Sequence, residues 1–275
     1  MDIGHKTLST KSAQFIKHFN DLNRPAFTID DAYALLKTST KDAVKKLMRD
    51  MIKRGLLMRL REGVYWIIPY EQDPNTYFPN WHLIAQYLVG DAGHYIGYYS
   101  AMEIHNLITQ PSLVERVVVN QQIKPSILEI HGIKFQFIYH NPRHFFGGEK
   151  IWVDGFNKVS CADLEKTIVD SLYKPGYSGG IVEIAKAIYK SKDKIDYQKL
   201  YQYCERFKAQ SVIKRLGFLL ESLEIKNPIS EALRQIKSDS FILLEPSYKK
   251  KGKWIRKWNV LQNMETTDIT SPIFT

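Results

Sequence analysis

Residues 40–67 read TKDAVKKLMRDMIKRGLLMRLREGVYWI, and this stretch decides the fold expected for the first part of the chain. Its first half places apolar side chains at the i, i+3, i+4, i+7 and i+8 spacing of one helix face: Val44, Leu47, Met48, Met51 and Ile52. Gly55 then supplies the left-handed residue that commonly ends a helix. The pattern predicts an amphipathic helix from Lys41 to Arg54, about 21 Å long.

The charged residues of this helix fall mostly on its other faces. The candidate DNA contacts on it are the capping residue Thr40 and the cations Lys41, Lys45, Lys46, Arg49 and Lys53. Lys and Arg contact phosphates, and long polar side chains on a helix reach base edges in a major groove about 12 Å wide. The helix is therefore a candidate for reading DNA. A solvated outer face and a protein-docking surface remain as alternatives, because they use the same residue types.

After Gly55 the hydrophobic period changes to two. Apolar residues alternate with two arginines in the order Met58, Arg59, Leu60, Arg61. Glu62-Gly63 can form a turn, and the apolar run 64–68 returns along a second strand. The segment predicts a β-hairpin, or wing, whose Arg59 and Arg61 can contact the DNA backbone or the adjacent minor groove.

Two further helices are expected before this stretch. Ser9 or Thr10 can cap the first, and Thr28, followed closely by two aspartates, can cap a short second one. Residues 37–40 have about the length of the turn in a helix-turn-helix. The order of these elements predicts a winged helix-turn-helix domain over residues 1–70.

Three prolines between residues 69 and 79 indicate a domain boundary, so residues 71–80 are expected to form a linker. Residues 81–275 are expected to form a mixed α/β domain with a helical C-terminal part, which gives an α+β protein. We expect helices at 81–89, 98–107, 161–173, 181–189, 197–207, 212–222 and 229–236. Strands are expected at 115–120, 127–130, 133–139, 151–153, 156–159, 241–244 and 254–260.

Charge points to a polyanionic partner. The 275 residues include 39 Lys and Arg against 29 Asp and Glu, a formal net charge of +10. Residues 1–70 hold 13 cations and 7 acids, residues 71–140 hold 3 and 6, and residues 141–275 hold 23 and 16. Two basic regions therefore flank an acidic middle.

Composition and the start of the chain narrow the class of protein. The hydrophobic content of 44% is typical of a globular protein. The two cysteines, Cys161 and Cys204, are too few and too far apart for a disulfide framework or a zinc knuckle. Without an apolar secretory segment behind Met1 or an uninterrupted apolar run of about 18 residues, we expect a cytoplasmic protein with no membrane partner.

A second basic run, residues 248–258, interleaves cations with aromatic side chains. It could contact nucleic acid or another partner, or it could be the solvated tip of a hairpin. Its candidate contact residues are Lys249, Lys250, Lys251, Lys253 and Arg256.

Three other groups of residues are of types found in metal, carboxylate or phosphate-binding sites. His140 and His144 are four residues apart, but Pro142 between them argues against a helix, so we expect a solvated loop and no metal. Ser160 is expected to cap the helix 161–173, with the carboxylates near its start explained by helix chemistry. The glycine pairs at 147–148 and 179–180 do not fit a phosphate-binding motif. We therefore expect no catalytic site and no cofactor.

The run from Arg54 to Trp66 resembles the N-terminal winged helix of the AbiEi-type family of antitoxins and transcriptional regulators. Segments 98–107, 132–137 and 159–170, followed by Gly179-Gly180, are similar in order and spacing to that family's second domain. The resemblance implies a type IV antitoxin and autorepressor. Its winged domain would bind inverted repeats in operator DNA, and its C-terminal domain would counteract a nucleotidyltransferase-like toxin.

On a palindromic operator, two copies of the chain would place their recognition helices about 34 Å apart, as a homodimer on DNA. Whether the toxin is contacted directly stays open. Two alternatives also stay open. One is a DNA-binding protein with a metal-dependent nuclease-like C-terminal domain that uses Asp154, Asp163 or Glu165. The other is a protein-docking module that uses the acidic middle and the basic tail.

Overall fold

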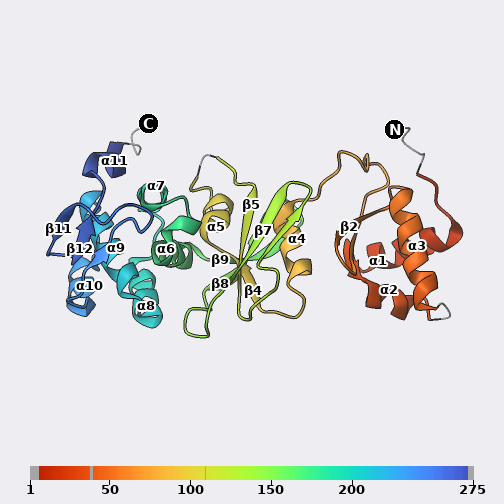
Figure 1. The fold of residues 1–275 in the computed structure, drawn as a ribbon, viewed down its shortest axis with the longest axis horizontal. Helices are drawn as coiled ribbons and strands as arrows, with labels where there is room; N and C mark the ends of the chain where they lie inside the picture. Colours follow the sequence, from red (N-terminus) through yellow and green to blue (C-terminus); the bar gives the residue numbers. More distant parts are fainter. Residues whose placement is uncertain (1–5, 38–39, 109, 272–275) are drawn as a thin grey trace. The chain divides into compact units, whose positions relative to one another are not determined.

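The structure is a computed structural model that describes residues 6–37, 40–108 and 110–271 (Figure 1). Within these residues the chain forms eleven α-helices and three β-sheets, so it is a protein of mixed α and β structure, as the sequence predicts. It divides into two compact units, Met1–Asp91 with Glu129–Ile133, and Ala92–Leu128 with Lys134–Thr275. Every helix in the described ranges is too short or too polar for a membrane span.

The first unit combines helices with a small antiparallel sheet. Its elements are α1 (Thr10–Asp21), β1 (Ala26–Thr28), α2 (Ile29–Leu35), α3 (Lys41–Lys53), β2 (Leu57–Arg61), β3 (Val64–Ile67) and α4 (Trp81–Leu88). The strands lie in the order β1-β3-β2. The helices and the hairpin match the sequence prediction, whereas β1 is an addition, because three residues are too few to show a period.

Helix caps set the starts of α1 and α2. The Ser9 hydroxyl accepts a hydrogen bond from the Ser12 amide at 3.3 Å. At α2, Thr28 Oγ1 accepts from the Asp31 amide at 3.1 Å, and the Asp31 carboxylate accepts from the Thr28 amide at 2.8 Å, a reciprocal capping box. Both caps confirm the predicted starts. Thr38 and Ser39, in the expected turn before α3, lie outside the described residues.

An aromatic cluster forms the core of the first unit. The ring of Phe19 lies 5.0 Å from Phe15 and 4.6 Å from Phe27, measured between ring centroids. Met48 and Met51 of α3 are completely buried in the same cluster. The apolar face of α3 is thus held against α1 and the sheet, and its opposite face is left in solvent.

The linker expected at residues 71–80 does not separate the two units, because the first unit continues to Asp91 and includes α4. The boundaries at residues 70 and 81 were therefore wrong. Hydrogen bonds explain why this proline-rich segment stays with the first unit. Lys6 Nζ donates to the carbonyls of Pro69 at 2.7 Å and Tyr70 at 3.0 Å, and Trp66 Nε1 donates to Tyr77 Oη at 3.3 Å.

The second unit begins with a mixed six-stranded sheet in the order β6-β7-β5-β4-β9-β8. Its strands are β4 (His94–Ile96), β5 (Val114–Val119), β6 (Ile127–Ile130), β7 (Ile133–Tyr139), β8 (Gly148–Trp152) and β9 (Lys158–Ala162), and the helix α5 (Tyr98–Ile104) follows β4. The pairs β5·β7 and β4·β9 are parallel, whereas β4·β5 and β8·β9 are antiparallel. The turn of the β6–β7 hairpin, Glu129–Ile133, groups with the first unit.

The helix expected from Ser160 starts later. Residues 158–162 belong to β9, and Asp163 caps α6 (Leu164–Tyr173) by accepting from the Lys166 amide at 2.8 Å. The prediction of Ser160 as the cap was wrong because Ser and Asp are comparable N-cap residues, and Ser160 instead pairs with Lys150 across the sheet.

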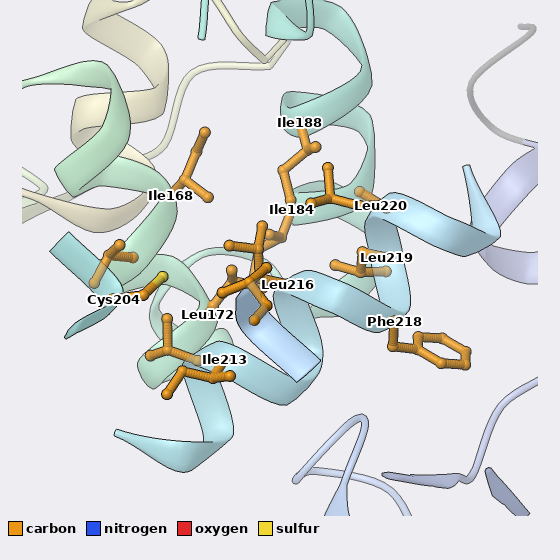
Figure 2. Packing of buried hydrophobic residues seen from close by; sticks show 14 of the residues in the cluster. Ile168, Leu172, Ile184, Ile188, Cys204, Ile213, Leu216, Phe218, Leu219 and Leu220 are labelled. Atoms are coloured by element: carbon orange, nitrogen blue, oxygen red, sulfur yellow. The ribbon is translucent and has the colours of Figure 1, made fainter. Parts of the chain in front are cut away.

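Helices form the next part of the second unit. After α6 come the short turn η1 (Pro175–Tyr177) and the helices α7 (Ile181–Ser191), α8 (Tyr197–Phe207), α9 (Gln210–Ser222) and α10 (Ser230–Ile236). Figure 2 shows their shared core, with Ile168 from α6, Ile184 from α7 and Leu216 from α9 directed toward one another. These helices confirm the helical segments predicted for this region.

A three-stranded sheet follows the helices, in the order β10-β12-β11. Its strands are β10 (Ile242–Leu243), β11 (Lys253–Ile255) and β12 (Val260–Gln262), and α11 (Thr266–Thr270) comes after them. The single strand expected at 254–260 is wrong, because the chain turns back between β11 and β12. Buried Trp258 in that turn donates from Nε1 to Glu221 Oε2 at 2.8 Å.

Candidate nucleic-acid interface

Helix α3 presents a cationic face because its apolar face is anchored. Thr40 Oγ1 accepts from the Ala43 amide at 3.2 Å and starts the helix. Val44, Met48 and Met51 are buried. The side chains on the other faces are exposed, and these are the predicted contacts Lys41, Lys45, Lys46, Arg49 and Lys53. The structure thus brings the five cations onto the solvent side of one rigid helix.

Arg54, at the end of α3, has a different role. Its guanidinium donates from Nη2 to Ser12 Oγ at 2.8 Å, from Nη1 to the Thr7 carbonyl at 3.1 Å and from Nε to the Asp50 carbonyl at 3.1 Å. These bonds fix the C-terminal end of α3 to α1 and to the segment before it. Arg54 therefore orients the helix, a role that no local sequence pattern indicates.

The β2–β3 hairpin adds two arginines to the same unit. Arg59 and Arg61 are exposed, while Leu60 between them is 3% exposed. The pairing register shifts between the two arginines, and Gly63 closes the turn with φ of +73°. Strand β2 packs against α3. The alternation seen in the sequence is confirmed, and the arginines lie on the side of β2 away from the core.

The seven cations of α3 and the hairpin are electrostatically available. Within residues 6–37, 40–108 and 110–271, none of them forms an ion pair, although other cations do. Arg24, for example, pairs with Asp31 at 3.2 Å. The Lys41 ammonium lies 5.7 Å from the centre of the Tyr33 ring, an exposed neighbour on α2. Cations without carboxylate partners can be neutralised by the phosphates of an incoming ligand.

The second basic run lies in the second unit, around β11. The five predicted residues, Lys249, Lys250, Lys251, Lys253 and Arg256, are all exposed. The next cation, Lys257, is instead paired with Glu221 at 2.8 Å.

His140 is not solvated, contrary to the expectation for the loop 140–144. It is 2% exposed. Its Nε2 lies 2.8 Å from Tyr98 Oη, and its Nδ1 lies 3.4 Å from Tyr95 Oη and from the His144 carbonyl oxygen. Burial, with the positive charge of Lys166 nearby, lowers the pKa of His140 to about 3, so the ring is neutral near pH 7.

A buried ion pair adjoins His140. The ammonium of Lys166 donates to Asp170 Oδ1 and, at 2.8 Å, to Tyr95 Oη, which itself donates to Asp170 Oδ2 at 3.0 Å. Both charged side chains are 0% exposed. Burial lowers the pKa of Lys166 and raises the pKa of Asp170. No local pattern in the sequence indicates this network, because its members come from β4, α5, α6 and the end of β7.

The three carboxylates of the nuclease alternative form ion pairs or accept hydrogen bonds within the protein. Lys199 Nζ lies 3.2 Å from the Asp163 carboxylate and 2.9 Å from that of Glu165. Although burial lowers the pKa of Lys199, the hydrogen bond to Glu165 and the charge of Asp163 raise it overall. Asp154 Oδ1 accepts from the amides of Phe156 and Asn157, at 2.8 Å and 2.7 Å, in the turn of the β8–β9 hairpin.

The part of the chain that the structure describes contains no group of three or more His, Cys, Asp or Glu side chains placed to hold a metal ion. Cys161 and Cys204 are buried free thiols. At the glycine pair before α7, Glu245 Oε2 accepts from the Ile181 amide at 2.8 Å. A carboxylate of the protein thus occupies the place where a phosphate would sit at this helix N-terminus.

No protein-family model matches the sequence. No curated protein matches it either. The structure is similar to the crystal structure of the RV2827C protein from Mycobacterium tuberculosis, with a TM-score of 0.72 and 12% sequence identity over 100% of this chain and 98% of that chain. At this identity the likeness concerns the fold alone.

Proposed function

We propose that the first unit is a winged helix-turn-helix domain that binds double-stranded DNA. The order α1, β1, α2, α3, β2, β3, with the hairpin β2–β3 directly after α3, supports this assignment. In such domains the second helix of the helix-turn-helix enters the major groove and the hairpin contacts the flanking backbone. Here these roles belong to α3 and to the β2–β3 hairpin.

The observation that carries the proposal is the set of seven exposed cations on α3 and the hairpin, none of which has a carboxylate partner among the described residues. Helix α3 has 13 residues, a rod of about 20 Å that fits a major groove. The α3 cations suit phosphate and base-edge contacts, and Arg59 and Arg61 suit the backbone beside the groove.

We further propose that the chain is an AbiEi-type antitoxin and autorepressor. The resemblance of residues 54–66 and of the segments in the second unit supports this role. The operator would contain inverted repeats, each read by one copy of α3, with the two helices about 34 Å apart. The second unit would counteract a nucleotidyltransferase-like toxin encoded beside the gene, without any enzymatic activity of its own.

The DNA-binding proposal is tested with the variant K45A/K46A/R49A. Fluorescence anisotropy of a labelled duplex from the region upstream of the gene would measure binding by the full chain at several salt concentrations. Each phosphate contact contributes about 0.9 to the slope of log affinity against log salt. We expect weaker binding and a slope lower by about 2.7, if all three side chains contact phosphate.

The matched control removes three exposed lysines from the second unit, K190A/K194A/K226A, and so changes the net charge equally. This control should bind the duplex almost as the wild-type chain does. Equal binding by the α3 variant and the wild-type chain would refute the DNA interface, provided that circular dichroism shows both folded. Equal losses in the two variants would mean that only overall charge matters.

The antitoxin role is tested by co-expression with the product of the adjacent gene. Residues 92–275 alone should restore growth when that product is toxic, while the full chain is needed to repress the promoter. Failure of the full chain to restore growth would reject the antitoxin role and leave the DNA interface unaffected.

A further inference from the structure

A second cationic surface lies on residues 246–258, which we call the β11 loop surface. This stretch contains six Lys and Arg residues and no Asp or Glu. One of them, Lys257, is paired with Glu221. Across the described ranges the other five make no ion pair, and all five are exposed: Lys249, Lys250, Lys251, Lys253 and Arg256. Their charge is therefore available to a ligand.

The backbone that carries these cations is held in place. Asn263 Nδ2 donates to the carbonyls of Glu245 at 2.8 Å and Lys249 at 3.3 Å, and Asn263 Oδ1 accepts from the Glu245 amide at 3.0 Å. At the start of β11, Gly252 packs so closely on Gln262 that a Cβ would overlap the Gln262 carbonyl. The loop is thus a fixed support for its lysines.

Exposed aromatic rings accompany the cations. Trp254 is 52% exposed, Tyr248 54% and Phe241 41%. The Trp254 and Phe241 rings are in edge contact, with centroids 4.8 Å apart and planes at 90°. These three side chains are large enough to be core residues, yet the fold leaves about half of each one exposed.

The sheet accounts for the position of Trp254. Because side chains alternate across a strand, Trp254 lies on the opposite face from its neighbour Ile255. Ile255 and its partner Val260 pack in the helical core shown in part in Figure 2. Trp254 pairs with Leu261 on the other face of the sheet, where Leu261 is 3% exposed and Trp254 is 52% exposed. The packing of the sheet therefore directs the indole away from the core and beside the basic loop.

We propose that the β11 loop surface binds single-stranded nucleic acid, with the cations on the phosphates and with Trp254 and Tyr248 stacked on unpaired bases. Charge alone would suit any polyanion. Exposed rings favour a single strand, because the bases of a duplex are already stacked and offer no free face. An acidic protein segment would be bound by the lysines but would leave the rings without a function.

The test uses the full chain and two fluorescein-labelled probes of about 20 nucleotides, oligo-uridine RNA and oligo-thymidine DNA, neither of which forms a duplex. Wild-type protein should bind at least one of them, and the tighter probe identifies the preferred sugar. Trp254→Ala should weaken binding about ten-fold or more, whereas Trp254→Phe, which keeps a ring, should stay within about three-fold.

The cations are tested separately. K249A/K250A/K251A should weaken single-strand binding and lower its salt slope by about 2, since each single-strand phosphate contributes about 0.7. The control K190A/K194A/K226A, with the same loss of charge, should change binding little.

The crossed experiment separates this surface from the proposed duplex site. K45A/K46A/R49A should lose duplex binding but keep single-strand binding, and the K249A/K250A/K251A variant should do the reverse. Binding of neither probe by the wild-type chain would overturn the proposal, as would unchanged binding by Trp254→Ala. So would an equal loss of single-strand binding in the α3 variant. If thermal melting shows that Trp254→Ala is misfolded, Tyr248→Ala replaces it with the same expectation.

Discussion

Replacing Asp170 with Asn should destabilise the second unit, because it removes the counter-charge of a completely buried ammonium group. Lys166 Nζ lies 5.0 Å from the centres of the Phe146 and Phe207 rings and 5.2 Å from that of Tyr95. Removing one partner of a buried ion pair typically costs about 3–5 kcal/mol. The three rings and the remaining amide oxygen offset part of this cost, so we expect a loss of about 3 kcal/mol.

A double-mutant cycle isolates the pair. Lys166→Met alone should cost a similar amount at pH 7, since it leaves the Asp170 carboxylate buried. The double variant K166M/D170N should lie within about 1–2 kcal/mol of the wild-type chain, because no unpaired charge remains. Urea unfolding gives the free energies. Hydrogen exchange of peptides from α6 assigns the transition to the second unit.

The pH dependence of Asp170→Asn provides an independent check. Burial lowers the pKa of Lys166 below its ordinary value of 10.5 in the folded chain, and the loss of Asp170, whose charge raises this pKa, lowers it further in the variant. Between the folded and unfolded pKa values the unfolded state binds more protons, so stability rises with pH. The variant should therefore recover part of its loss as the pH approaches 10.5. Our reasoning fails if Asp170→Asn is within about 0.5 kcal/mol of the wild-type chain, or if the two single losses simply add.

Two further stability predictions concern buried groups of the second unit. The pKa of His140 is lowered from 6.5 to about 3, so between these two pH values the unfolded state binds more protons than the folded state. Acidification from pH 6.5 to pH 5 should therefore lower the free energy of unfolding by about 2 kcal/mol. His140→Gln should remove that part of the pH dependence in urea titrations, and an unchanged dependence would contradict it. Gly217→Ala should lower the melting temperature, because the added Cβ would overlap the buried Trp258 ring. This overpacking costs about 1–3 kcal/mol or more, which exceeds the gain of about 1 kcal/mol from alanine's higher helix propensity. Gly176→Ala, which meets open space, is the control, and a higher melting temperature for Gly217→Ala would contradict the overlap.

Hydrophobic periodicity predicted the helices and strands that bury one face and are long enough to show a repeat. Helix α3 has the expected start, and α8 has both of its expected ends. The β6–β7 turn at His131-Gly132 is also as predicted, and both residues have positive φ, at 48° and 83°. In each case the signal lies within a few neighbouring residues, so the sequence alone contains it.

The elements and contacts that were missed depend on distant parts of the chain. Strand β1 has three residues and exists because β3 pairs with it. His140 is surrounded by Tyr95, Tyr98 and Asp170, which are at least 30 positions away in the sequence. Arg54 is an anchor only because α1 brings Ser12 to it. No local pattern distinguishes such residues from solvated ones, because tertiary packing decides their environment.

The same limit applies to the two cationic surfaces, which net charge and residue counts cannot tell apart. Helix α3 and the β11 loop surface each carry five lysines and arginines without an ion pair among the described residues. Their difference lies in what accompanies the charge: α3 itself carries no aromatic residue and has Tyr33 of α2 beside Lys41, whereas the β11 loop surface carries exposed Trp254 and Tyr248 within its own basic run. The phosphates of a duplex or of a single strand can neutralise the cations, but only unstacked bases can stack on the aromatic rings. The crossed variants therefore test this distinction directly. If binding depended on charge alone, the protein would bind duplex and single strand with the same surface.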